Sequence, residues 1–439
     1  MSKNLDINVH HLTRVEGHGN IVVNMRDGKL ERAELEIVEA MRYFEAMLKG
    51  RSFHEAAIIT SRICGICALG HQMTSLKATE DALGLEISKQ TSLLLRKLLV
   101  NGATLQSNIL HVYFLVAPDL LGAPSVFPLI PTHKEVILRA LRMKRLANDI
   151  GDIVSGRAVH PITPVPGGFT KIPTVGELKE IKRKLIEEGL PDVKETVETI
   201  KSLAGSIPNF TRETEYISLK HKGEYAFYDG DIYSSDTGFK DVHDYKQMTN
   251  EFIVPHSTSK HAKHNRTSYM VGALARWNNN HDQMTELSQA VAEQLGLTPK
   301  TYNPYFNNIA QVVECAHCIE DSIKIIDELL ADGLKDEKPN QTPTKFGRGV
   351  GSTEVPRGIL YHEYEYDRRG NIVYANCIIP TGQNLANIDD DMKKLVPEII
   401  EKPKEDIIKH LEMLVRAYDP CISCSVHMLN VEFINEDNE

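Results

Sequence analysis

The chain has 439 residues and a formal net charge of −10, from 50 Lys and Arg against 60 Asp and Glu. Its hydrophobic content of 41% is ordinary for a globular protein and excludes wholesale disorder. The acidic balance disfavours nucleic-acid binding, and no apolar run approaches the ~20 residues of a membrane-spanning helix. We therefore expect no nucleic-acid partner and no membrane span, and we expect no secretory signal because the N-terminus lacks an apolar core.

The N-terminal 40 residues predict a β hairpin, because segments 20–25 and 30–38 flank an Asp27-Gly28 pair that is typical of tight turns. From about residue 42 the hydrophobic period becomes helical. Helices are predicted over residues 71–83, 88–115, 133–154, 177–203, 305–334 and 404–417.

The remaining segments read as loops and strands. Residues 335–351 predict a polar linker, and residues 358–380 a second hairpin around Asp367-Arg-Arg-Gly370. The basic stretch 260–264 is interpreted as a solvated loop. No strand–helix alternation indicates a parallel sheet, so we predict an α-rich α+β fold with a large helical core and small β hairpins. We expect one composite domain over 1–427, with the hairpin at 1–40, the helical core at 41–205 and 283–335, an irregular α/β insert at 206–282, and a C-terminal hairpin and metal loop at 352–427.

Six of the seven cysteines form C-x-x-C pairs. Two pairs near opposite ends of the chain, Cys64 with Cys67 and Cys421 with Cys424, could supply four sulfur ligands to one thiophilic metal. Spacing alone does not choose among zinc, iron–sulfur and another metal, and structural zinc remains an alternative.

Charged neighbours favour a reactive centre over a purely structural metal site. Arg62 precedes the first pair and Asp419 the second, and nearby charge controls the protonation of thiolates. The third pair, Cys315 and Cys318, lies within a predicted helix without a partner pair. We interpret these two residues as packed core cysteines.

Residues around both pairs, and several blocks between them, form one ordered set. The blocks are Arg14-Val-Glu-Gly-His18, Glu45, Arg62-Ile-Cys-Gly-Ile-Cys67 with His71, Glu354-Val-Pro-Arg-Gly358, Cys377-Ile-Ile-Pro-Thr381 and Asp419-Pro-Cys-Ile-Ser-Cys424-Ser-Val-His427. In content and order, over nearly the whole chain, they resemble the large, catalytic subunit of nickel–iron hydrogenases.

The resemblance implies a buried nickel ion bound by Cys64, Cys67, Cys421 and Cys424. Cys67 and Cys424 would also bind an iron that carries cyanide and carbon monoxide ligands. The implied reaction is the reversible heterolytic cleavage of dihydrogen to protons and electrons. Soft thiolates suit a redox-active nickel, which agrees with this implication.

The same resemblance implies roles for residues around the metals. Cys421, as a terminal thiolate, would accept the proton first, and Glu16 matches the family's proton-relay carboxylate. Arg357 matches the arginine over the metals; it would position the substrate, held by Asp419, although pairing with Glu354 is a simpler alternative. The remaining matches are Thr381 and the backbone near Pro356, which would hydrogen-bond the iron's cyanides.

A second cation, magnesium or iron, is implied near the C-terminus. Its ligands would be Glu45, His427 and a backbone carbonyl close to Cys377, while the Cys377 thiol itself is expected to be structural. Carboxylate oxygen suits magnesium, whereas an imidazole ligand favours iron.

The resemblance also implies partners. Pro380-Thr-Gly-Gln-Asn384 and Gln106-Ser-Asn108 look more like the cytoplasmic, multi-subunit hydrogenases than the membrane-bound uptake enzymes. Four cysteines are committed and the rest lack cluster spacing, so electrons would leave first through an iron–sulfur small subunit, then through a flavin, ferredoxin-like or heterodisulfide module. The 428–439 extension would be removed by a maturation endopeptidase, unless this chain keeps its tail.

Three other interpretations stay open. A complex I-like scaffold shares the fold, but that family has lost the four cysteines. A structural zinc protein would hold zinc and have no activity. A hydrogen sensor would use the same centre with slow turnover.

Overall fold

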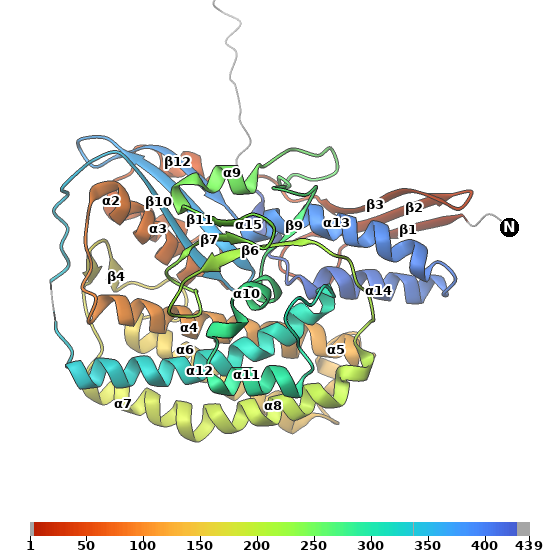
Figure 1. The fold of residues 1–439 in the computed structure, drawn as a ribbon, viewed down its shortest axis with the longest axis horizontal. Helices are drawn as coiled ribbons and strands as arrows, with labels where there is room; N and C mark the ends of the chain where they lie inside the picture. Colours follow the sequence, from red (N-terminus) through yellow and green to blue (C-terminus); the bar gives the residue numbers. More distant parts are fainter. Residues whose placement is uncertain (1–3, 337, 428–439) are drawn as a thin grey trace, which may run out of the picture.

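The computed structural model describes residues 4–336 and 338–427. About half of the described residues are helical, and the strands among them form four small sheets. In Figure 1 the long helices fill the lower half of the view and the two three-stranded sheets lie above them, toward opposite sides. This arrangement agrees with the predicted helical core and small hairpins.

The N-terminal hairpin is confirmed and is extended by one strand. Strands β1 (Leu5–Val9), β2 (Gly19–Arg26) and β3 (Lys29–Ile37) form an antiparallel sheet in that order. Asp27 and Gly28 both have positive φ, 49° and 77°, as the tight turn between β2 and β3 requires. The short β1 was not predicted, although its sequence Leu-Asp-Ile-Asn-Val alternates between apolar and polar residues as a half-buried strand does.

Three long helices form the centre of the core. Helices α4 (Ser92–Leu110), α6 (Lys134–Ser155) and α12 (Asn307–Asp332) match three predicted segments, and α4 packs against both of the others. Helix α4 continues as a π-helical turn over His111–Val116. The charged segment predicted as one helix forms α7 (Val175–Lys184) and α8 (Leu190–Leu203), joined by a second π-helical turn.

The helix after the first cysteine pair begins earlier than predicted. Helix α3 (Ala68–Leu83) begins directly after Cys67, so the second cysteine of the pair occupies its N-cap position. The last predicted helix, α14 (Lys404–Ala417), has the expected bounds. The other helices are α1 (Phe44–Leu48), α2 (Phe53–Thr60), α5 (Ala117–Leu120), α9 (Tyr245–Thr249), α10 (Ala273–Asn280), α11 (Glu286–Gln294), α13 (Pro380–Ile399) and α15 (Ile422–Ser425).

The second sheet begins inside the segment predicted as a linker, so the prediction of a linker as far as residue 351 is wrong. Strands β10 (Arg348–Val355), β11 (Gly358–Tyr366) and β12 (Ile372–Ile378) are antiparallel neighbours. Strand β10 packs closely on α3 through Gly349 and Gly351. Without side chains at these positions the segment carried no hydrophobic alternation, which is why it looked like a linker.

The close approach of β10 to α3 predicts a large stability effect. A Cβ at Gly351 would lie 2.5 Å from the Ala78 nitrogen and would also meet the Thr74 carbonyl oxygen, and neither backbone atom can move away easily. We expect Gly351→Ala to destabilise the protein by ~1–3 kcal/mol, measured as a lower Tm in thermal unfolding. Gly205→Ala is the matched control, since no atom lies within 4 Å there; equal Tm values for the two variants would contradict the prediction.

Residues 206–282 contain short strands and loops, as predicted, together with α9 and α10. A four-stranded sheet has the order β8-β7-β6-β9, and a two-stranded β4–β5 ribbon precedes it in the chain. Among residues 4–336 and 338–427, no helix combines the length and apolarity needed to cross a membrane. The strands are β4 (Pro164–Val165), β5 (Gly168–Phe169), β6 (Glu215–Lys220), β7 (Asp231–Ser234), β8 (Gly238–Lys240) and β9 (Tyr269–Met270).

Candidate metal centre

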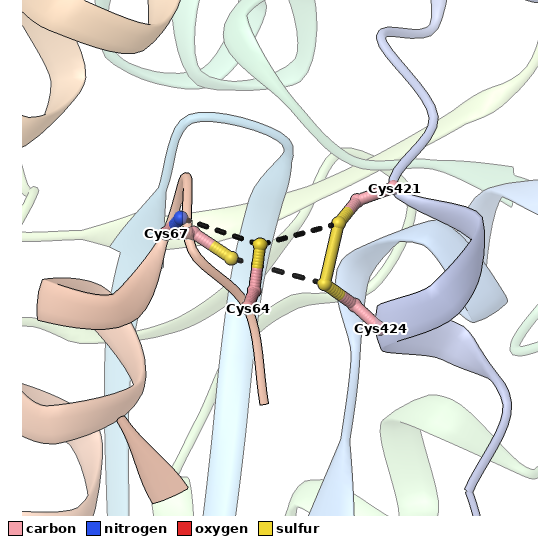
Figure 2. A group of neighbouring side chains, drawn as sticks. All are labelled: Cys64, Cys67, Cys421 and Cys424. Carbon is pink, nitrogen blue, oxygen red and sulfur yellow. Dashed lines mark hydrogen bonds between the residues drawn. A yellow bond between two sulfur atoms is a disulfide. The ribbon is translucent and has the colours of Figure 1, made fainter. Parts of the chain in front are cut away.

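The two terminal cysteine pairs meet in the interior of the protein. Cys64 Sγ lies 3.6 Å from Cys421 Sγ, and Cys67 Sγ lies 3.9 Å from Cys424 Sγ. All four sulfurs lie within 4.8 Å of one another, and all four residues are buried. Figure 2 shows the loop before α3 and the segment at α15 facing each other through these side chains.

Backbone pairing holds the C-terminal segment against the N-terminal part of the chain. The Ile422 N–H donates to the Glu16 carbonyl over 2.8 Å, and the Arg42 N–H donates to the Val426 carbonyl over 2.8 Å. At Gly17 a Cβ would lie 2.7 Å from the Ile422 Cβ, so only glycine allows this approach. These contacts explain why residues more than 350 positions apart share one site.

The first pair has an asymmetric electrostatic environment. A hydrogen bond from the Cys67 thiol, the positive charge of Arg357 and backbone N–H groups together lower the pKa of Cys64 to about 6, against the effect of burial. The same bond and burial raise the pKa of Cys67. The prediction that Arg62 supplies the local charge is wrong, because Arg62 is exposed and Arg357 acts in its place.

The second pair is joined: Cys421 and Cys424 form a disulfide, whereas the described cysteines outside this pair are free (Figure 2). Thiolates, not a disulfide, are the form of cysteine that binds metals. Metal binding by all four residues therefore requires that this pair be reduced.

A buried arginine lies beside the cysteines. Arg357 Nε donates to the Asp419 carbonyl over 2.7 Å, and Nη2 donates to Asp419 Oδ1 over 2.9 Å. Its remaining nitrogen, Nη1, is buried without a hydrogen-bond partner among the described residues. Glu354, the alternative partner, instead accepts a hydrogen bond from Arg276 Nη1 over 2.8 Å.

The guanidinium of Arg357 stays protonated. Burial favours the neutral form, but the charges of Asp419, Cys67 and Cys64 outweigh it and raise the pKa of Arg357. Arg357 is therefore a fixed positive charge that interacts with Cys64 and Cys67, and its unpaired Nη1 is available as a hydrogen-bond donor.

Glu16 contacts the second cysteine pair directly. Its Oε2 lies 3.2 Å from Cys421 Sγ and accepts a hydrogen bond of 3.1 Å from the Ser423 N–H. The Ser423 hydroxyl donates to the other carboxylate oxygen, Oε1. Sequence reasoning missed Ser423, because a serine between two cysteines carries no spacing signal of its own.

Thr381 contacts the centre through Cys421, whereas Pro356 directly precedes Arg357 in the chain. Thr381 Oγ1 accepts a hydrogen bond of 3.0 Å from the Cys421 N–H, which leaves its hydroxyl hydrogen free to donate. The Pro356 carbonyl accepts from Arg276 Nη2 over 3.0 Å.

A second polar cluster surrounds His427. The ring Nδ1 lies 2.8 Å from Glu45 Oε1, and Nε2 lies 3.3 Å from Glu251 Oε1. Burial lowers the pKa of His427, but the two carboxylates outweigh it and raise the pKa to about 9. Glu45 Oε2 is buried and has no hydrogen-bond partner among the described residues. An unpaired buried carboxylate oxygen next to an imidazole fits a cation-binding site.

Glu251 was not predicted, because it lies in the irregular insert, outside any motif. Lys260 Nζ donates to its Oε2 over 2.8 Å, so the interpretation of residues 260–264 as a solvated loop is wrong. His261 and Ala262 in this stretch are buried. Cys377 is also buried, and burial followed by the charges of Glu45 and Glu251 raises its pKa, as expected for a structural thiol.

The rings of two motif histidines contact residues other than the four cysteines. His18 is exposed and lies 2.9 Å from Glu39 Oε1 through its Nδ1. His71 is buried, with Nδ1 3.2 Å from His362 Nε2, and burial lowers its pKa to about 3.

The third cysteine pair forms part of the core, as predicted. Cys315 and Cys318 lie on α12, are free and buried, and burial raises the pKa of both thiols. A raised pKa keeps a thiol protonated and unreactive, which is the expected state of packed core cysteines.

The donor set fits a nickel–iron centre. Four buried sulfurs that converge within 4.8 Å match the preference of thiophilic metals, and the unpartnered Arg357 Nη1 gives an adjacent hydrogen-bond donor. A purely structural zinc site has no use for a buried cation and a carboxylate in contact with its sulfurs.

Comparisons with known proteins agree with the geometry. The family described as nickel-dependent hydrogenase matches residues 42–128 and 206–427, and a family described as HoxL-like matches residues 6–40. The chain is 34% identical to the alpha chain of sulfhydrogenase 1 from Pyrococcus furiosus over 97% of this chain and 99% of the relative. It is 30% identical to a chain of the F420-non-reducing hydrogenase vhc from Methanococcus voltae over 97% of this chain and 96% of the relative.

Comparison of the fold with solved structures agrees with the sequence comparisons. The crystal structure of an NAD+-reducing [NiFe]-hydrogenase in the H2-reduced state superposes with a TM-score of 0.87 and 28% identity, covering 96% of this chain and 99% of that chain. The family match over most of the chain, the relatives and the shared fold lead to one conclusion: this chain is a member of the nickel-dependent hydrogenase large-subunit family.

Proposed function

We propose that this chain catalyses the reversible heterolytic cleavage of dihydrogen to protons and electrons. The observation that carries the proposal is the convergence of four buried cysteine sulfurs beside a charged arginine and a carboxylate. Cys64, Cys67, Cys421 and Cys424 would hold nickel, and Cys67 and Cys424 would share an iron with cyanide and carbon monoxide ligands. When bound, this centre would supply the redox chemistry that splits dihydrogen.

The chain's own residues would then move the proton. Cys421 Sγ and Glu16 Oε2, 3.2 Å apart, are close enough for proton transfer from a thiol to a carboxylate. The hydrogen bonds from Ser423 fix both oxygens of Glu16, so the carboxylate stays oriented toward the sulfur.

Arg357 would hold the substrate region by electrostatics rather than act as a base, since its guanidinium stays protonated. Thr381 has a free hydroxyl hydrogen for an iron ligand, and the backbone near Pro356 would serve the same purpose.

Glu45, His427 and a backbone carbonyl near Cys377 would bind magnesium or iron. His427 would have to lose a proton to become a ligand, so Glu251, which stabilises the protonated ring, would compete with the cation. The free Oε2 of Glu45 is the strongest support for a cation at this position.

The partner would be an iron–sulfur small subunit. Tyr43 and Met47, at α1, are about half exposed, 49% and 48%, and offer apolar surface for a protein partner. The relatives include subunits of a sulfhydrogenase, an F420-non-reducing hydrogenase and an NAD-reducing hydrogenase. We therefore propose that electrons reach a soluble acceptor through a flavin, ferredoxin-like or heterodisulfide module. We also propose a cytoplasmic location.

Residues 428–439 lie outside the described residues. We propose that a maturation endopeptidase removes them after His427 once nickel is inserted, in a chain whose residues 1–427 form one composite domain. The mass of the purified chain shows whether residues 428–439 are removed, and its nickel content is measured in the same preparation. A chain that holds nickel and keeps the tail would contradict the proposed cleavage.

The proposed function is tested by purifying the chain with its co-purifying subunits. We expect about one nickel per chain and hydrogen-dependent reduction of a redox dye. Zinc in place of nickel, with no hydrogen uptake, would overturn the proposal in favour of a structural zinc protein. Nickel-free protein without hydrogen uptake would favour a complex I-like scaffold.

A further inference from the structure

Three polar residues on one face of α12 contact the segment that carries Asp419 directly and the segment that carries Arg357 through Arg276. Asn307, Gln311 and Glu314 are spaced four and three residues apart, which places them on the same side of the helix, and all three are buried. Asn307 Nδ2 donates to the Ala417 carbonyl over 2.8 Å, next to the C-terminal metal loop. Buried polar side chains are costly unless they are paired, so this face of α12 has a specific structural use.

Gln311 connects to the guanidinium of Arg357 through one carboxylate. Its Nε2 donates to Asp419 Oδ2 over 3.2 Å, while the other oxygen, Oδ1, accepts from Arg357 Nη2 over 2.9 Å. Asp419 has a φ of 52°, which non-glycine residues rarely adopt. A side chain in such a turn needs support from outside the turn to keep one orientation, and Gln311 gives that support.

The amide of Gln311 is oriented by the Asp419 carboxylate. Its Nε2 faces that carboxylate as a donor, and a flipped amide would set its oxygen against the carboxylate instead. On the other side, His111 Nδ1 lies 2.6 Å from Gln311 Oε1, and its Nε2 lies 2.8 Å from the Arg416 carbonyl. The contacts that lead from His111 to Arg357 therefore include the backbone of the segment that carries Asp419.

The same helix also holds the backbone before Arg357. Arg276 donates through Nη1 to the Val355 carbonyl over 2.9 Å and through Nη2 to the Pro356 carbonyl over 3.0 Å. Glu314 on α12 accepts from Arg276 Nε over 2.6 Å and from Nη2 over 2.9 Å. Helix α12 thus fixes Arg357 at two points, the main chain through Glu314 and the guanidinium through Gln311.

From these contacts we propose that Gln311 is a positioning residue for the hydrogenase reaction: acting through Asp419, it aims the free Nη1 of Arg357 at the cysteine cluster. Nη1 is the one nitrogen of this side chain without a partner among the described residues, and a guanidinium released by Asp419 would rotate it away. The inference rests on the proposed function and adds a residue about 108 positions from Asp419 in the sequence to the machinery of that site.

The test uses two variants of the complete enzyme with its partner subunits. Gln311→Met keeps the length of the side chain and removes its polar contacts with Asp419 and His111, whereas Gln311→Glu keeps the shape but sets a carboxylate against Asp419. We expect both to retain nickel, to lose at least tenfold in kcat for hydrogen oxidation with an unchanged KM for hydrogen, and to show a displaced Arg357 guanidinium in a crystal structure. If the methionine variant does not fold, the kcat and the Arg357 position in the glutamate variant decide whether Gln311 is a positioning residue.

Ile319→Ala is the matched control, because it opens a cavity in the buried face of α12 away from this network. It should lower Tm and leave kcat within twofold of the wild type. The inference is overturned if both Gln311 variants keep nickel and wild-type kcat, or if Ile319→Ala loses as much kcat as they do. A wild-type enzyme without hydrogen uptake would defeat the proposed function instead, and the position of Arg357 in the variant crystals would still decide the role of Gln311.

Discussion

Cys421→Ser is expected to abolish hydrogen oxidation and to reduce the nickel content of the purified enzyme. The sulfur of Cys421 is the one that both faces Cys64 and contacts Glu16, so the substitution would remove a proposed metal ligand and the proposed first proton acceptor together. A serine hydroxyl is a hard, weakly acidic ligand and does not replace a soft thiolate. We expect turnover to fall by at least ~10³-fold, equivalent to about 4 kcal/mol of lost transition-state stabilisation.

Nickel and zinc are measured in the same preparations by mass spectrometry, beside hydrogen-dependent dye reduction. Cys318→Ser is the matched control, because Cys318 is equally buried but lies on α12 in the packed core. It should cost some stability and leave the nickel content unchanged. Wild-type nickel and turnover in the Cys421→Ser enzyme would show that this sulfur is not a ligand.

Glu16→Gln is expected to give the second largest effect, with the metal content intact. Glutamine has the same shape and can still accept the hydrogen bond from the Ser423 N–H, but it cannot take up a proton from Cys421 Sγ. General acid–base groups contribute ~10²–10⁴-fold to rate, so turnover should fall within that range. Exchange of hydrogen isotopes between dihydrogen and solvent water should fall in parallel, because it needs the same proton transfer.

The control for this substitution is Glu39→Gln. Glu39 lies near Glu16 in the sequence and accepts hydrogen bonds from the His18 N–H and ring, but it does not contact the cysteines. Its replacement should leave turnover and isotope exchange unchanged. A Glu16→Gln enzyme with normal isotope exchange would place the proton path elsewhere.

The local elements could be predicted from the sequence wherever a periodic pattern decides the structure. Helices α12 and α14 have apolar residues at helical spacing, and β2 and β3 surround an Asp-Gly turn, so local preference and burial agree. Helix α13 was not predicted, because Gln383, Asn387 and Asp391 face the interior and bind other segments there. A polar residue that is buried in a tertiary network looks like a surface or loop residue in the sequence.

The sequence by itself determined which residues are candidates for the centre: two C-x-x-C pairs offer four sulfurs, and the blocks that resemble the hydrogenase family point to Glu16 and Arg357. Tertiary structure decided which groups control those sulfurs. In the structure Arg62 lies outside the site, whereas Ser423, Glu251 and Gln311, which no sequence signal of their own marks, contact residues of the site. The physical reason is that ligand type is a property of a residue, whereas charge, hydrogen bonding and burial are properties of its neighbours in space, and here those neighbours come from opposite ends of the chain.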